Sequence, residues 1–230
     1  MVDKLDFESQ DQAKRLWQKY GLKLILLILI VLIAIIIWQY FDKRMLEKEA
    51  AASQLYQNMT VIMQNSGADN ASVKTQAKQL IQLYPKSIYA DFARLMLAKA
   101  AISQNALSKA KSWLTPVAEH SQNANLQIIA KLRMARIEIA LGQSQTALEL
   151  LKTVQSKAYA LSVNRISGFA YYTQKDYAQA KLAWQKALQY ANKPALAAIK
   201  RLLQMEIDSL AALNMAKTPE APPKNTTQKS

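Results

Sequence analysis

Residues 24–38 read LILLILIVLIAIIIW, an unbroken run of fifteen apolar residues. Extended to Leu22 and Phe41, this stretch reaches the roughly 20 residues that a helix needs to cross a hydrocarbon core of about 30 Å. Amphipathic aromatic residues, which gather at membrane interfaces, flank it on both sides: Trp17, Tyr20, Trp38 and Tyr40. We therefore expect a transmembrane helix over residues 22–41.

A cleaved signal peptide and a buried helix of a soluble core are the alternatives for this stretch. A signal peptide has a short basic leader and a cleavage site of small residues. Here the leader, residues 1–21, is long and mixed in charge, and the stretch ends in the bulky sequence WQYF at residues 38–41. A charge at mid-span would cost about 2.5–3.5 kcal/mol, and none occurs between residues 24 and 38. The residues favour a retained span.

The charges beside the span predict its orientation. Five Lys and Arg residues lie before the apolar run that starts at residue 24, the last of them Lys23, and three lie in the twenty residues after Phe41. Because cytoplasmic flanks carry the excess of positive charge, we expect residues 1–21 to be a cytoplasmic leader. The downstream region then lies across the membrane.

The composition favours a helical domain after the span. The 230 residues contain no cysteine and only four glycines, which excludes disulfides and thiolate metal sites and argues against a β-rich or nucleotide-loop protein. Ala, Leu, Lys and Gln, which form helices well, are abundant. The net charge of +14 lies almost wholly downstream of the span. This excess is suited to anionic membrane lipids or acidic partners, or is simply a solvated basic face. No basic cluster interleaved with aromatics points to nucleic acid.

After residue 42 the apolar residues recur with a period near 3.6, which predicts a series of helices joined by short turns. The first continues from the span to about Gln64. Pro116 lies inside one helix and should kink or shorten it. Residues 215–230 are polar and proline-containing, and we expect them to be disordered. The remaining helices are predicted at 69–83, 87–103, 106–119, 123–141, 144–155, 158–174, 176–191 and 194–213.

One pair of these helices closely resembles a tetratricopeptide repeat. That repeat has small residues where paired helices approach and aromatic residues between hairpins, and the chain matches at Gly168, Tyr171, Ala180, Trp184 and Ala187. The same template fits less completely at Ala135, Ala147 and Leu151, and again at Ala98, Ala110 and Leu114. We therefore predict an all-α protein, with a single N-terminal transmembrane helix followed by a tetratricopeptide-like helical-hairpin solenoid over residues 42–214. An irregular helical bundle is the alternative.

No motif for catalysis, cofactor or metal binding is found. His120, the single histidine, falls in a predicted loop. Glu138 and Glu149 are expected to be ordinary solvated carboxylates. We therefore expect a protein that is not an enzyme and has no cofactor.

A solenoid of helical hairpins presents a concave surface that binds peptides or partner helices. The first helix of each hairpin lines that surface at about its second, fifth, ninth and twelfth positions. Apolar and aromatic groups alternating with cations would suit unfolded, mildly acidic segments. The groove residues predicted on this basis are Phe92, Leu95, Lys99, Ile102, Leu132, Arg136, Ile139, Arg165, Phe169 and Tyr172.

The order of parts resembles the YfgM family. The leader sequence RLWQKYG at residues 15–21, the span ending at Phe41 and the motif ALGQSQTAL at residues 140–148 fit its pattern, together with the repeat at 168–188. The resemblance implies a single-span protein of the bacterial inner membrane, with the N-terminus in the cytoplasm and the repeat domain in the periplasm. It further implies an ancillary subunit of the SecYEG translocon that pairs with the periplasmic chaperone PpiD and receives translocating polypeptides. An envelope-assembly or cell-division scaffold is the alternative function.

Overall fold

The computed structural model describes residues 3–67 and 71–217, and every regular element in these ranges is a helix. The all-α fold class is therefore confirmed. The helices are α1 (Asp3–Ser66), α2 (Ala71–Leu83), α3 (Ile88–Ser103), α4 (Leu107–His120), α5 (Ala124–Ala140), α6 (Ser144–Lys152), η1 (Lys157–Tyr159), α7 (Ala160–Thr173), α8 (Tyr177–Gln189), η2 (Pro194–Leu196) and α9 (Ala197–Lys217).

The chain divides into two compact units between Gln57 and Asn58. The helix α1 continues without a break through this boundary and through residues 21 and 41, where the sequence predicted the span to begin and end. Among the described helices, α1 alone is long and apolar enough to cross a membrane, by length and composition. Its large apolar side chains at residues 25–38 are exposed, as lipid contact requires.

Each end of the apolar stretch carries a cation over a tyrosine ring. The ammonium of Lys23 lies 5.9 Å from the ring centroid of Tyr20, and the guanidinium of Arg44 lies 4.8 Å from that of Tyr40. Such amphipathic pairs suit the headgroup region, where an apolar body and a charged tip are both accommodated. The bounds of the span, residues 22–41, stay a prediction.

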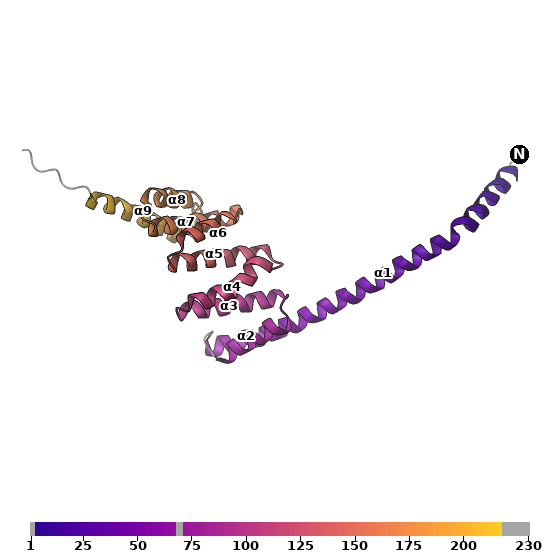
Figure 1. The fold of residues 1–230 in the computed structure, drawn as a ribbon, viewed down its shortest axis with the longest axis horizontal. Coiled ribbons are helices and arrows are strands. Elements are labelled where there is room, and N and C mark those ends of the chain that lie inside the picture. The colour runs from indigo at the N-terminus through magenta and orange to yellow at the C-terminus, as the bar shows by residue number, and fades with distance from the viewer. Residues whose placement is uncertain (1–2, 68–70, 218–230) are drawn as a thin grey trace, which may run out of the picture. The chain divides into compact units, whose positions relative to one another are not determined.

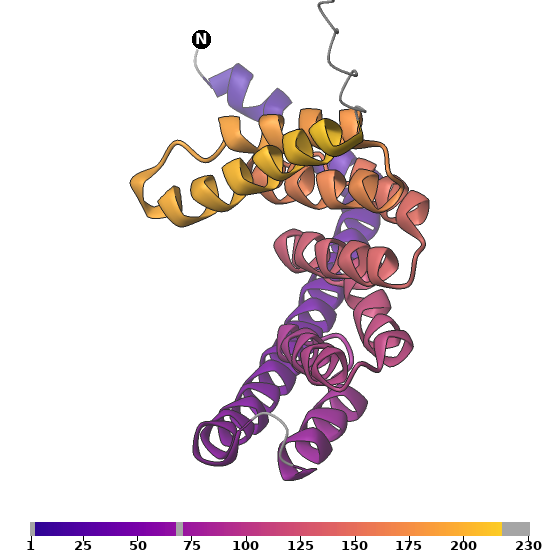
Figure 2. The same ribbon diagram turned by 90° about the vertical axis from the view of Figure 1, so that its left-hand side faces the viewer.

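In the second unit the helices form consecutive hairpins, α3 with α4, α5 with α6 and α7 with α8 (Figure 1). Each hairpin packs on the next, because α4 contacts α5, α6 contacts α7, and α9 packs on α8 (Figure 2). Small residues allow this close approach: Ala98, Ala110, Ala135, Ala147, Ala180 and Ala187 are all fully buried. The predicted solenoid of hairpins is therefore the observed architecture.

Side-chain caps explain where several helices begin. The side chain of Asn123 accepts hydrogen bonds from the backbone N–H groups of Asn125 and Leu126 at the start of α5. Asp176 accepts from the N–H of Gln179 at the start of α8. Such caps satisfy N–H groups that have no partner within the helix. The left-handed φ of +78° at Gly142 lets the chain turn from α5 towards α6.

Some predicted boundaries were wrong. Pro116 does not shorten α4, which continues to His120. The helix α6 ends at Lys152 rather than at 155, and α9 continues through residues 215–217, which were predicted to be disordered. The rest of the predicted tail, residues 218–230, lies outside the described residues.

Candidate functional site

The strongest repeat is held together by a contact between a glycine and a tryptophan. Gly168 is buried in α7, and a methyl group added at its Cα would overlap the indole ring of Trp184 on α8. The indole is 2% exposed, and its Nε1 donates a hydrogen bond to the carbonyl oxygen of Arg165 at 3.1 Å. This contact fixes how α7 and α8 face one another and so positions the side chains of α7.

The ten predicted groove residues all lie on α3, α5 and α7, the first helices of the three hairpins, and we call this surface the α3–α5–α7 face. Five are exposed, namely Lys99, Ile102, Arg136, Phe169 and Tyr172, and three are half-buried, namely Phe92, Ile139 and Arg165. Leu95 and Leu132 are only 7% and 5% exposed and belong to hydrophobic clusters between helices. These two leucines contribute to packing, and the other eight are accessible at least in part.

An open cavity of about 320 Å³ lies on this face. Three predicted residues, Lys99, Ile102 and Arg136, line it. The prediction missed the other lining residues, which are Leu107, Arg133, Ile137 and Ala140. The sequence spacing could have identified those on α5, because residues 133, 136, 137 and 140 are three or four positions apart and so lie on one side of that helix.

Cationic groups gather around the cavity. The side chain of Arg133 donates a hydrogen bond from Nη1 to the carbonyl oxygen of Leu95 at 3.2 Å, which ties α5 to α3. Although Arg136 is an exposed residue overall, its guanidinium is partly buried, and this burial lowers its pKa. The neighbouring charges of Arg165 and Arg133 lower the pKa further. Of the three guanidinium groups, that of Arg165 has a carboxylate partner, Glu206 on α9, at 2.6 Å. A negatively charged group bound beside Arg136 would therefore be electrostatically stabilised.

Aromatic rings extend the face along α7. The ring of Phe169 meets that of Trp184 edge to face at 5.4 Å between centroids, and the guanidinium of Arg165 lies 5.5 Å from the Phe169 ring centroid. The ring centroid of Tyr172 lies 5.7 Å from that of Tyr177 and 6.0 Å from that of Trp184. Because Phe169 and Tyr172 remain 37% and 38% exposed, these supported rings can contact an apolar ligand.

Glu138 contradicts the prediction of a solvated carboxylate. Its side chain is 2% exposed and pairs with the ammonium of Lys111 on α4, with 2.6 Å between Nζ and Oε1. The carboxylate thus links α4 to α5. His120 also differs, since it is the last residue of α4 rather than part of a loop, and its side chain is 79% exposed.

The α3–α5–α7 face has the features of a binding surface. Within residues 20–67 and 71–210, whose side chains are described almost throughout, no group of three or more His, Asp or Glu is placed to hold a metal ion. The α3–α5–α7 face combines an open apolar cavity, cations and supported aromatic rings. Such a surface can recognise apolar and acidic side chains of a polypeptide.

Comparisons with known proteins agree with this architecture. A family model described as a tetratricopeptide repeat-like domain matches residues 14–212. The ancillary SecYEG translocon subunit of Escherichia coli (strain K12) is 27% identical over 89% of this chain and 96% of its own length. The protein of the same name from Haemophilus influenzae is 27% identical over 78% of this chain and 86% of its own length. That from Neisseria gonorrhoeae is 24% identical over 88% of this chain and 96% of its own length. No solved structure matches. Because the family model covers most of the sequence, the chain belongs to the tetratricopeptide repeat-like domain family, and its relatives identify it as a member of the YfgM family.

Proposed function

We propose that the protein is a non-enzymatic ancillary subunit of the SecYEG translocon. The names of its relatives support this association, and the apolar part of α1 supplies a membrane anchor. The excess of basic residues before the span supports an N-terminus in the cytoplasm. Residues 42–214 then lie in the periplasm, beside the exit of the channel.

The domain, in this proposal, links translocating polypeptides to a periplasmic chaperone such as PpiD. The observation that carries it is the open cavity of the α3–α5–α7 face, which is mainly apolar and bordered by Lys99, Arg133 and Arg136. An emerging polypeptide exposes apolar side chains that a folded protein buries. Transient binding of those side chains near the channel would shield them until a chaperone takes over. In this proposal, membrane lipids surround residues 25–38, whose large apolar side chains are exposed.

Site-specific photo-crosslinking in native membranes tests this proposal. A photoreactive residue at Ile28 should crosslink to subunits of the Sec channel, and one at Phe169 or Tyr172 should crosslink to secreted chains or to a chaperone. Gln185, which is exposed on α8 and outside the α3–α5–α7 face, is the matched control and should give neither product. If position 28 crosslinks only to lipid and position 169 to cell-division or cell-wall proteins, the translocon assignment is wrong.

A further inference from the structure

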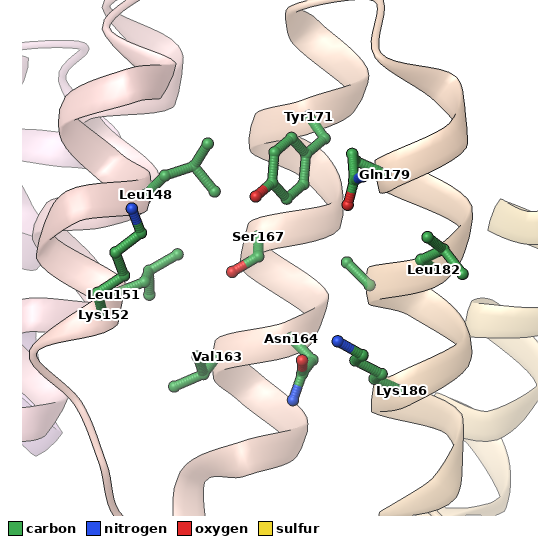
Figure 3. Close-up of a pocket in the computed structure, with 11 residues that line it drawn as sticks. Leu148, Leu151, Lys152, Val163, Asn164, Ser167, Tyr171, Gln179, Leu182 and Lys186 are labelled. Atoms are coloured by element: carbon green, nitrogen blue, oxygen red, sulfur yellow. The ribbon is translucent and has the colours of Figure 1, made fainter.

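We propose that the cleft between α6, α7 and α8 is a second binding site, which takes an acidic peptide segment of a partner protein with one apolar anchor side chain. The cleft, which we call the α6–α8 cleft, has a volume of about 190 Å³. In Figure 3 it lies over α7, with α6 on one side and α8 on the other. It shares no lining residue with the cavity of the α3–α5–α7 face, so the inference is independent of the function proposed above.

The cleft exists because α7 departs from the repeat pattern at two positions. A tetratricopeptide repeat begins with the pattern W-x2-L-G-x2-Y. The glycine and the tyrosine are present as Gly168 and Tyr171, but Asn164 stands in place of the tryptophan and Ser167 in place of the leucine. Both residues line the cleft. Two small polar side chains thus leave open a space that the pattern fills with large apolar ones.

The polar side chains around this space are free to bind a ligand. Among the described residues, the side chains of Lys152, Ser167, Tyr171, Gln179 and Lys186 have no hydrogen-bond or ion-pair partner. They offer two ammonium groups, two hydroxyls and an amide, and no carboxylate lines the cleft. Lys152 comes from α6 and Lys186 from α8, on opposite sides of α7 (Figure 3). This set is complementary to carboxylates.

The rest of the lining is apolar and selects a peptide over a free anion. Leu148 and Leu151 come from α6, Val163 from α7 and Leu182 from α8, and Leu182 remains 50% exposed. A cavity of about 150 Å³ holds benzene, so the cleft has room for one apolar side chain. A free phosphate would leave these walls uncovered, and a flat lipid surface would touch the lysines without entering. A segment such as glutamate–leucine–glutamate satisfies both the walls and the lysines.

Fluorescence anisotropy with a labelled synthetic peptide tests the site on the full chain in non-ionic detergent. The probe carries one central leucine between glutamates. Two matched peptides replace either the leucine with serine or the glutamates with glutamine. We expect both matched peptides to bind at least about tenfold more weakly than the probe. The double variant Lys152→Gln/Lys186→Gln should weaken probe binding to a similar degree.

The variant Ser167→Leu tests the cavity itself, because it restores the pattern residue and fills the space. It should abolish probe binding while circular dichroism shows an intact fold. If this variant fails to fold, the double lysine variant decides, since both lysines are exposed. Lys181→Gln on α8 and Arg136→Gln on the α3–α5–α7 face are matched controls and should change affinity by less than about twofold.

Three results would overturn the proposal. The three peptides bind equally well, or the control variants weaken binding as much as the double lysine variant does, or phosphatidylglycerol vesicles displace the probe as effectively as unlabelled peptide. The first two would indicate non-specific attraction to a basic protein. The third would indicate that the lysines contact lipid headgroups.

Discussion

Gly168 is the residue on which the packing of α7 against α8 depends most directly. In Gly168→Ala the added methyl group displaces the indole of Trp184 and breaks its hydrogen bond to Arg165. Overpacking of this kind costs about 1–3 kcal/mol and the lost hydrogen bond about 1 kcal/mol, while the better helix propensity of alanine returns about 1 kcal/mol. We expect a net loss of about 1–3 kcal/mol in the free energy of unfolding, measured by urea titration and circular dichroism. Gln185→Ala is the control and should change it by less than about 0.5 kcal/mol. Equal stability of Gly168→Ala and the native protein would contradict the contact.

The buried pair of Lys111 and Glu138 also makes a residue-scale prediction. Lys111→Met leaves the carboxylate without its partner inside the protein, and breaking a buried pair in this way costs about 3–5 kcal/mol. The side chain of Lys111 is 40% exposed, which places the expected loss at the lower end of that range. The double variant Lys111→Met/Glu138→Leu should recover most of the loss, because two apolar side chains need no charged partner. Thermal unfolding of the three proteins gives the comparison. A double variant as unstable as Lys111→Met would show that the pair is not what holds α4 to α5.

Repeat positions predicted which helices form the α3–α5–α7 face, but not which of its side chains are buried. Lys99 and Arg136, which were predicted to line the groove, also line the cavity, whereas Leu95 is buried and Arg133 was not among the predicted residues. That these residues bind a ligand stays a prediction. Repeat position gives the side of a helix to within about one residue. Which neighbour turns inward depends on how the next hairpin rotates against it, and periodicity along one helix carries no information on that rotation. The same reason applies to Glu138, whose partner Lys111 lies on another helix.

At the scale of elements, most helices began and ended within three residues of their predicted bounds, because the signals are local. Asn123 and Asp176 cap the helices that follow them, and Gly142 supplies the left-handed turn. Pro116 was predicted to kink or shorten its helix, and α4 is not shortened. The proline ring removes a single hydrogen bond late in α4, and the contacts of Leu114 and Val117, both fully buried, keep the helix in place. Tertiary packing thus outweighed a local signal.

The helix α9 acts as the cap of the solenoid, and two adjacent leucines test this role. Leu203 is fully buried in a cluster with Trp184, Ala187 and Ala191, whereas Leu202 is 42% exposed. We expect Leu203→Ala to lower the free energy of unfolding by about 2–5 kcal/mol and Leu202→Ala by less than about 0.5 kcal/mol. Both variants lose the same atoms from the same helix, so only burial separates them. Similar losses for the two would mean that α9 does not pack on α8 as described.

At the scale of the whole molecule, the charge balance opposes the compact fold. Most of the net charge of +14 lies beyond the span, and such self-repulsion destabilises a folded domain. Arg136 shows the effect locally, since its pKa is lowered by burial and by the charges of Arg165 and Arg133. Stability should therefore rise as salt screens these charges.

Raising sodium chloride from about 10 mM to about 1 M shortens the screening length from about 30 Å to about 3 Å. We expect the unfolding temperature in non-ionic detergent to rise by about 3 °C or more, equivalent to about 1 kcal/mol for a domain of this size. Arg136→Gln should raise the unfolding temperature at low salt and reduce the response to salt, because it removes a guanidinium that the charges of Arg165 and Arg133 repel. Lys181→Gln removes one positive charge elsewhere on the domain and should raise the unfolding temperature by less. If salt lowers the unfolding temperature, then ion pairs such as Arg165–Glu206 outweigh the repulsion, and the basic excess does not lower the stability of the domain.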